Sequence, residues 1–147
     1  MSAVPTAIDA LVAEFTAGMP GVQIVDGPPV VDVRGDVVGV GAVLDQELPL
    51  DLDSLESPAG LQAVRKQCTV TCLARSWSGN AAVKPQRDRT YGIVTQVRGL
   101  LRANPTLSGA VIQARYAGDT YRPWRSEQAQ LVVDVAFRVD VTVLTNS

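Results

Sequence analysis

The last part of the chain has the most regular pattern of apolar and polar positions. From Leu131 to Val143 every second residue is apolar, and most of the residues between them are charged or polar. Alternation with period two places the apolar side chains on one face of a β-strand. We therefore expect a strand over residues 130–144, much longer than the usual strand of about five or six residues.

The same alternation occupies residues 62–77. Its apolar positions are Val64, Cys68, Val70, Cys72 and Ala74, and its polar positions are Arg65, Gln67, Thr69, Thr71 and Arg75. One buried face and one face in water are typical of an antiparallel sheet that is covered on a single side. We expect shorter strands over residues 22–25, 30–33, 37–43 and 110–117.

Two segments have the spacing of amphipathic helices. The first begins near Thr6, runs for about ten to twelve residues and ends before Gly18, with apolar residues at positions i, i+3, i+4 and i+7. In the second, Asp88 is the expected N-cap and Ala103 the end.

Gly92 and Gly99 lie seven residues apart in the second expected helix, on a face with Gln96 and Ala103. Each glycine costs about 1 kcal/mol relative to alanine in a helix. Either another backbone approaches the helix closely there, or the glycines are tolerated without a function. The sequence leaves both explanations open.

Turns and loops are expected at three places. Arg34-Gly35-Asp36 predicts a tight hairpin between two of the short strands. Residues 118–128 are expected to turn the chain into the last strand. Residues 45–61 carry five acids and two prolines without a helical period, which predicts a long acidic loop.

The order of these elements indicates a fold class. It is a helix, three short strands, the acidic loop, a strand, a helix and two strands. Strands that pair with sequence neighbours, covered by two helices, predict an α+β two-layer sandwich. We expect a mainly antiparallel or mixed sheet with both helices on one face, a long C-terminal strand, and one domain over residues 1–147.

Charge is divided unevenly along the chain, although the net charge is only −2. Residues 1–60 contain ten acids and one base, whereas residues 61–147 contain five acids and twelve bases. Such asymmetry indicates interaction surfaces unless folding interleaves the two halves. The bases around the second helix are suited either to phosphates or to the acidic loop of a neighbouring copy; they are Arg75, Lys84, Arg87, Arg89, Arg98 and Arg102.

The residues needed for common catalytic and metal sites are missing. The chain has no histidine, and its two cysteines, Cys68 and Cys72, lie about 13 Å apart along one face of the expected strand. They are predicted to be buried free thiols rather than a disulfide or a zinc site. Without a nucleophile or phosphate-binding motif, the sequence predicts no enzyme, no cofactor and no metal. No segment has the composition of a secretion signal or a membrane span, so no membrane partner is expected.

The element order resembles that of tail terminator proteins of long-tailed, siphovirus-type bacteriophages, a class that includes the lambda tail terminator. The resemblance covers nearly the whole chain. It lies in TAIDALVAEFTAGMPGVQIV, VRGDVVGV, AVRKQCTVTCLARSW, RTYGIVTQVRGLLRAN and VVDVAFRVDVTVL, in that order. It rests on length and element order, because no short invariant motif matches.

This resemblance implies a structural virion protein at the head-tail junction, assembled in the host cytoplasm. Its subunits would form a ring, expected to be a hexamer, that caps the tail tube, ends tube growth and receives the head connector. The implied partners are further copies of the chain, the tail tube protein, the connector or stopper, and genomic DNA passing through the lumen without sequence-specific binding. The alternatives are another neck protein, such as a stopper or connector, or a small-ligand-binding module.

Charged positions supply the candidate subunit-interface residues. They are Asp51, Asp53 and Glu56 in the acidic loop, Arg87 and Arg89 in the second helix, and Asp134, Arg138 and Asp140 on the expected wet face of the last strand. Alternating signs on that face are suited to charge pairing with another copy and oppose unspecific edge pairing.

Overall fold

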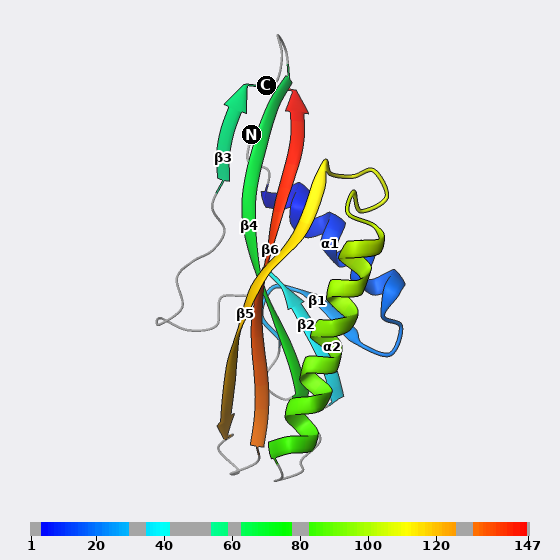
Figure 1. The fold of residues 1–147 in the computed structure, drawn as a ribbon, viewed down its shortest axis with the longest axis vertical. Helices are drawn as coiled ribbons and strands as arrows, with labels where there is room; N and C mark the ends of the chain where they lie inside the picture. The colour runs from blue at the N-terminus through cyan, green and yellow to red at the C-terminus, as the bar shows by residue number, and fades with distance from the viewer. Residues whose placement is uncertain are drawn as a thin grey trace.

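A computed structural model describes residues 4–29, 35–41, 54–58, 63–77, 83–125 and 131–146. Two helices and six strands make an α+β fold, as predicted. The elements are α1 (Val4–Gly18), β1 (Gln23–Asp26), β2 (Gly35–Val40), β3 (Ser54–Pro58), β4 (Ala63–Trp77), α2 (Val83–Ala103), β5 (Gln113–Arg125) and β6 (Leu131–Asn146) (Figure 1). Neither helix is long and apolar enough to cross a membrane.

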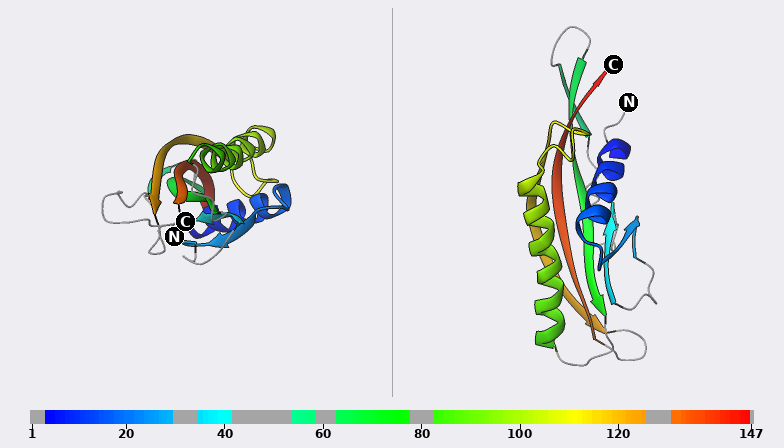
Figure 2. Two further views of the ribbon diagram at one scale, coloured as in Figure 1. Left: turned by 90° about the horizontal axis from the view of Figure 1, so that it is seen from below. Right: turned by 90° about the vertical axis from the view of Figure 1, so that its right-hand side faces the viewer.

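The two long strands β4 and β6 form the centre of a mixed sheet. The strand order is β1-β2-β4-β6-β5, and β3 pairs with β4 off this path. β1 and β2 are parallel, and the other neighbours are antiparallel. β4 and β6 run along the long axis of the molecule, and their ends near β3 extend past both helices (Figures 1 and 2).

One face of the sheet and both helices share the core. The apolar positions of the two long strands lie opposite each other; for example, Cys72 pairs with Phe137, and Val70 with Val139. Ala7, Leu11 and Phe15 of α1 and Ile93, Val94, Val97 and Leu101 of α2 pack against this face. The predicted two-layer arrangement with a long last strand is confirmed.

Both helices begin earlier than the sequence predicted. α1 starts at Val4, so Thr6 lies inside its first turn, and Pro5 occupies an early position that proline tolerates. α2 starts at Val83, so Asp88 is not its N-cap. Contacts with β6 fix this extra turn: Gln86 Nε2 donates to the Leu131 carbonyl at 3.2 Å.

The predicted hairpin around Arg34-Gly35-Asp36 is wrong. Gly35 and Asp36 already belong to β2, and Val37 to Val40 pair with β1 on one side and β4 on the other. Both edges of Val37–Val40 are therefore paired, and residues 30–34 lie outside the described part of the chain. The turn signal was correct only in that Gly35 has a positive φ of 97°.

The predicted acidic loop contains a strand. Ser54–Pro58 forms β3 and pairs antiparallel with residues 64–68 of β4, while the rest of 45–61 lies outside the described residues. β2 pairs with the same edge of β4 at residues 72–77, so β3 continues the sheet beyond the end of β2. A sequence of low strand propensity is held there because an edge of β4 needs hydrogen-bond partners.

Residues 118–125 are also a strand where a turn was predicted. β5 runs from Gln113 to Arg125 and pairs with β6 along its whole length, with a bulge between Tyr116 and Gly118. The bulge accommodates Gly118, whose φ is 131°. Pro123 is tolerated because β5 is the last strand of the sheet.

The glycines of α2 face open space. A Cβ atom built at Gly92 or Gly99 meets no atom of the described residues within 4 Å. Within the described part of the chain no other backbone approaches the helix at these glycines, which favours the explanation that they are tolerated there.

Candidate interaction surface

The sequence-predicted interface residues do not form one cluster. Asp51 and Asp53 lie outside the described residues, and Glu56 lies in β3 opposite Lys66 in the strand register. Arg87 and Arg89 are in the first half of α2. Asp134, Arg138 and Asp140 are on β6, on the sheet face away from the helices.

Arg89 makes a contact inside the chain. Its Nε lies 2.9 Å from Asp36 Oδ1, which joins α2 to β2, and Ser76 Oγ donates to the same carboxylate oxygen at 3.0 Å. Arg87 lies 3.9 Å from Asp88, a separation that binds weakly at a surface. Arg89 thus has a partner on another element of the chain, whereas Arg87 has only a weak contact with its neighbour on α2.

Asp134 is buried rather than exposed as predicted, with 6% of its surface accessible. Arg75 Nε and Nη2 donate to its two carboxylate oxygens at 2.8 and 3.1 Å. Trp124 Nε1 donates to Oδ2 at 2.8 Å, and the Arg75 guanidinium lies 5.4 Å from the Trp124 ring centroid. Three strands supply these side chains, so the sheet face away from the helices is not uniformly wet at this end.

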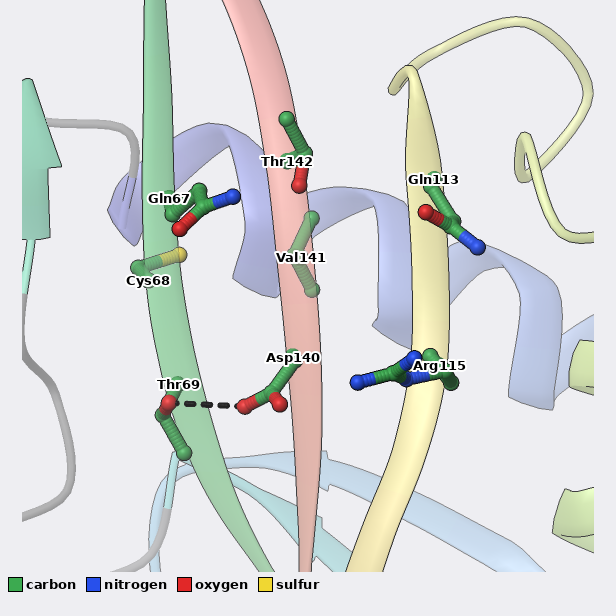
Figure 3. A pocket seen from close by; sticks show the side chains of 8 residues that line it. All are labelled: Gln67, Cys68, Thr69, Gln113, Arg115, Asp140, Val141 and Thr142. Atoms are coloured by element: carbon green, nitrogen blue, oxygen red, sulfur yellow. Dashed lines mark hydrogen bonds between the residues drawn. The ribbon is translucent and has the colours of Figure 1, made fainter. Parts of the chain in front are cut away.

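The other end of that face has a polar hollow of about 410 Å³. Its lining comes from β4, β6 and β5 and consists of Gln67, Cys68, Thr69, Gln113, Arg115, Asp140, Val141 and Thr142 (Figure 3). Thr69 Oγ1 donates to Asp140 Oδ1 at 2.8 Å, and Arg115 extends from β5 towards Asp140. Asp140, unlike Asp134, is therefore accessible to a partner.

A second hollow, of about 300 Å³, lies between the C-terminal half of α2 and the start of β5. We call it the arginine hollow, and define it by Arg98, Leu101, Arg102, Pro105, Gln113, Ala114, Arg115 and Tyr116. The Arg98 guanidinium lies 4.9 Å from the Tyr116 ring centroid. Three arginines and no acid line this hollow, which makes it attractive to anions.

Sequence reasoning found only part of the arginine hollow. Arg98 and Arg102 were noted among the bases of the second helix, and their i, i+4 spacing already places them on one face. Arg115 was not connected to them. Only the packing of β5 against α2 brings it to the same hollow.

The two cysteines of the core are held in their neutral forms. Burial, and secondarily the charge of Asp140, raises the pKa of the Cys68 thiol to about 11. Burial raises the pKa of Cys72 to about 12, against a small opposing effect of a backbone hydrogen bond from Gly41. Both thiols are free and buried, as predicted, and neither has the depressed pKa of a nucleophilic cysteine.

Tyr116, beside the arginine hollow, is also held neutral. Burial raises its pKa, and the hydrogen bond that its hydroxyl donates to Asp119 raises it further. Among the described residues, no group of three or more cysteines and carboxylates is placed to hold a metal ion. The arginines that line the arginine hollow are suited to binding an anion through charge.

The chain has no recognised family and only a weak structural likeness to a known protein. No family model matches the chain, and no curated protein matches it. One solved structure that it resembles is a chain in the virion of a native gene transfer agent particle, with 12% identity and a TM-score of 0.36. That likeness covers 90% of this chain and 84% of the other. A TM-score this low does not support a shared function, so the proposals below rest on the residues of this chain.

Proposed function

We propose that this protein is a structural protein of a phage-like virion, and that its subunits form a ring that caps the tail tube. The ring ends tube growth, receives the head connector at the head-tail junction, and lets DNA pass through its lumen. Residues 1–147 act as one ring-forming domain in this proposal. The resemblance in element order to tail terminators supports it, and so does the fold.

The observation that carries the proposal is the separation of charge across the sheet. β1, β2 and β3 come from the acidic first sixty residues and lie together on one side of β4. β6 and β5, from the basic remainder, lie on the other side. Folding of the sheet therefore does not interleave the two halves.

The strand order supports a head-to-tail contact, because the strands on the two sides of β4 come from segments of unlike net charge. Each copy presents one edge to the unlike edge of the next, and such a heterologous contact closes into a ring when its rotation permits. A contact between two identical edges would instead bring like charges together. The charge separation thus supports a ring more than a two-fold dimer.

The test is the mass of the purified chain by light scattering, alone and with tail tubes from the same particle. We expect a mass near six times 15.6 kDa, either in solution or on the tube ends. Electron microscopy of the mixtures should show rings at one end of the tubes and no further growth of capped tubes. A strict monomer that ignores tubes would contradict the proposal.

A stopper or connector of the same neck is the second candidate, since it shares the need for ring contacts. It differs in its partner: a stopper binds isolated connector rings and does not stop tube growth. A small-ligand module is supported less, because ligand pockets are mostly apolar, whereas the hollow around Asp140 is lined mainly by polar side chains.

A further inference from the structure

We propose that the arginine hollow is the docking site for residues 47–53 of a second copy of this chain. This inference rests on the proposed ring and names the contact that would build it. The sequence already suggested that the bases around α2, Arg98 and Arg102 among them, could meet the acidic loop of a neighbouring copy. The structure adds the hollow that these two arginines line together with β5.

The arginine hollow has a charged rim and an apolar floor. Arg98, Arg102 and Arg115 are exposed, whereas Leu101 and Ala114 are buried to 3% exposure each. No carboxylate lines the hollow, but Arg115 also extends towards Asp140 of the neighbouring polar hollow. Arg98 and Arg102 are therefore the guanidinium groups that the hollow offers to an acid of another copy. A guanidinium binds a carboxylate through two parallel hydrogen bonds, which gives such a site geometric specificity.

Residues 47–53 have the matching composition. The stretch reads Glu47-Leu-Pro-Leu-Asp-Leu-Asp53 and contains three acids, three leucines and no base. Its leucines match the apolar floor, and its carboxylates match the rim. This favours a peptide over the backbone of DNA, whose phosphates carry charge but no apolar side chains.

The topology favours a second copy as the source. Residues 47–53 lie between β2 and β3, which both pair with the edge of β4 that faces away from β6. The arginine hollow lies against β5, beyond β6, on the opposite side of the sheet. A contact between these opposite sides joins unlike surfaces and is therefore head-to-tail.

Peptide binding to the full chain tests the site directly. A fluorescent peptide of residues 45–56 should bind at low ionic strength, as read by anisotropy. The double variant Arg98→Glu, Arg102→Glu should bind it at least about tenfold more weakly, which is about 1.4 kcal/mol. The matched control Lys84→Glu, Arg87→Glu changes the charge by the same amount on the same helix, about three or more turns away, and should bind normally.

Two further probes identify the partner class. The same peptide with its acids replaced by amides should bind as weakly as the double variant. The affinity of a short DNA duplex should be the same for the wild-type chain and for the Arg98→Glu, Arg102→Glu variant. The inference is wrong if the amide peptide binds the wild-type chain, and the acidic peptide binds the double variant, as tightly as the acidic peptide binds the wild-type chain. It is also wrong if Arg98 and Arg102 affect binding of the duplex but not of the peptide.

Mixing two defective variants tests the head-to-tail geometry. Copies with Arg98→Glu and Arg102→Glu keep the acidic segment, and copies with Asp51→Asn and Asp53→Asn keep the arginines. Each alone should fail to form rings. Their mixture has one working contact per pair and should give dimers but no rings, as read by light scattering.

The outcomes separate this inference from the ring proposal. If the wild-type chain forms rings and either variant also does so normally, the ring stands and this contact is wrong. If the wild-type chain never forms rings but the peptide binds with the expected dependence on arginine, the site stands and the ring is wrong.

Discussion

At the scale of single residues, the Arg75–Asp134 pair is the most constrained polar contact on the sheet face away from the helices. Both residues are less than one-tenth exposed, and Trp124 covers and hydrogen-bonds the pair. Arg75 Nη1 has no hydrogen-bond partner among the described residues. Because a buried charge is costly when its partner is removed, each member of this pair depends on the other.

Removing the carboxylate should therefore destabilise the fold. We expect Asp134→Ala to lower the free energy of unfolding by about 3–5 kcal/mol, because it leaves the Arg75 guanidinium buried and uncompensated. Asp140→Ala, on the same strand and face, loses one hydrogen bond from Thr69 and should cost about 1 kcal/mol. Urea denaturation of both variants measures the difference. Equal costs would show that burial of Asp134 contributes nothing.

The two cysteines predict how stability depends on alkaline pH. Burial raises the pKa of Cys68 from 9.0 to about 11 and that of Cys72 to about 12, so the folded chain holds both protons more tightly than the unfolded chain. Their stabilising effect is complete below pH 9.0 and is lost as the pH rises towards 11–12. Urea denaturation at pH 8 to 11 should show this fall, and a Cys68→Ala, Cys72→Ala variant should show less of it.

At the scale of elements, the sheet and the second helix use glycine for different purposes. Gly118 sits in the bulge of β5 with φ of 131°, a conformation that side chains rarely adopt. Gly99 sits in α2, exposed and with open space around it. The first glycine is required by the backbone, and the second only weakens its helix.

These two glycines should respond oppositely to alanine. We expect Gly99→Ala to raise the free energy of unfolding by about 0.5–1 kcal/mol, because it removes the helix penalty without a clash. Gly118→Ala should lower it by about 1–3 kcal/mol through backbone strain alone, since the nearest atom to its Cβ would be Arg138 Nη2 at 3.7 Å. Thermal or urea unfolding measures both. A stabilised Gly118→Ala would show that the bulge is not fixed by the fold.

At the scale of the whole molecule, the strand order keeps the acidic and basic halves of the chain on opposite sides of β4. The strands on one side of β4 thus come from the acidic half and those on the other side from the basic half, although Arg89 of α2 pairs with Asp36 of β2 across this division. Surfaces of unlike charge guide association between copies and set its orientation more than they stabilise each copy.

Salt should therefore weaken assembly without unfolding the subunit. Raising NaCl from about 0.1 M to about 1 M shortens the screening length from about 10 Å to about 3 Å. We expect rings to dissociate at least about tenfold more readily at the higher concentration, as followed by light scattering. Circular dichroism should stay unchanged over this range, because the apolar core is not screened. Rings indifferent to salt would contradict a charge-based contact.

The candidate surface was only partly predictable from the sequence. The spacing of Arg98 and Arg102 along a helix fixes a shared face, whatever surrounds it. Arg115 joins the arginine hollow only because β5 packs against α2, and no pattern in the sequence near Arg115 predicts that packing. In the same way, Asp134 looked exposed because alternation reports only that one face differs from the other, and it does not report what covers either face.

The sequence by itself determined the elements whose own periodicity is strong. These are the cores of both helices, the long strands β4 and β6, the two buried free cysteines and the α+β class. Their apolar positions recur often enough that only one local structure buries them together. The physical reason is that the hydrophobic effect favours burying apolar side chains, and the spacing of these side chains within one segment decides whether a helix or a strand brings them to one face.

The tertiary structure alone decided the elements whose pattern is weak. β3, the second half of β5 and the first turns of α2 exist because β4 and β6 offer them backbone and side-chain partners. The strand order, and with it the separation of charge and the arginine hollow, follows from pairings between distant residues. A local pattern cannot encode these pairings, since their free energy appears only once the long central strands are in place.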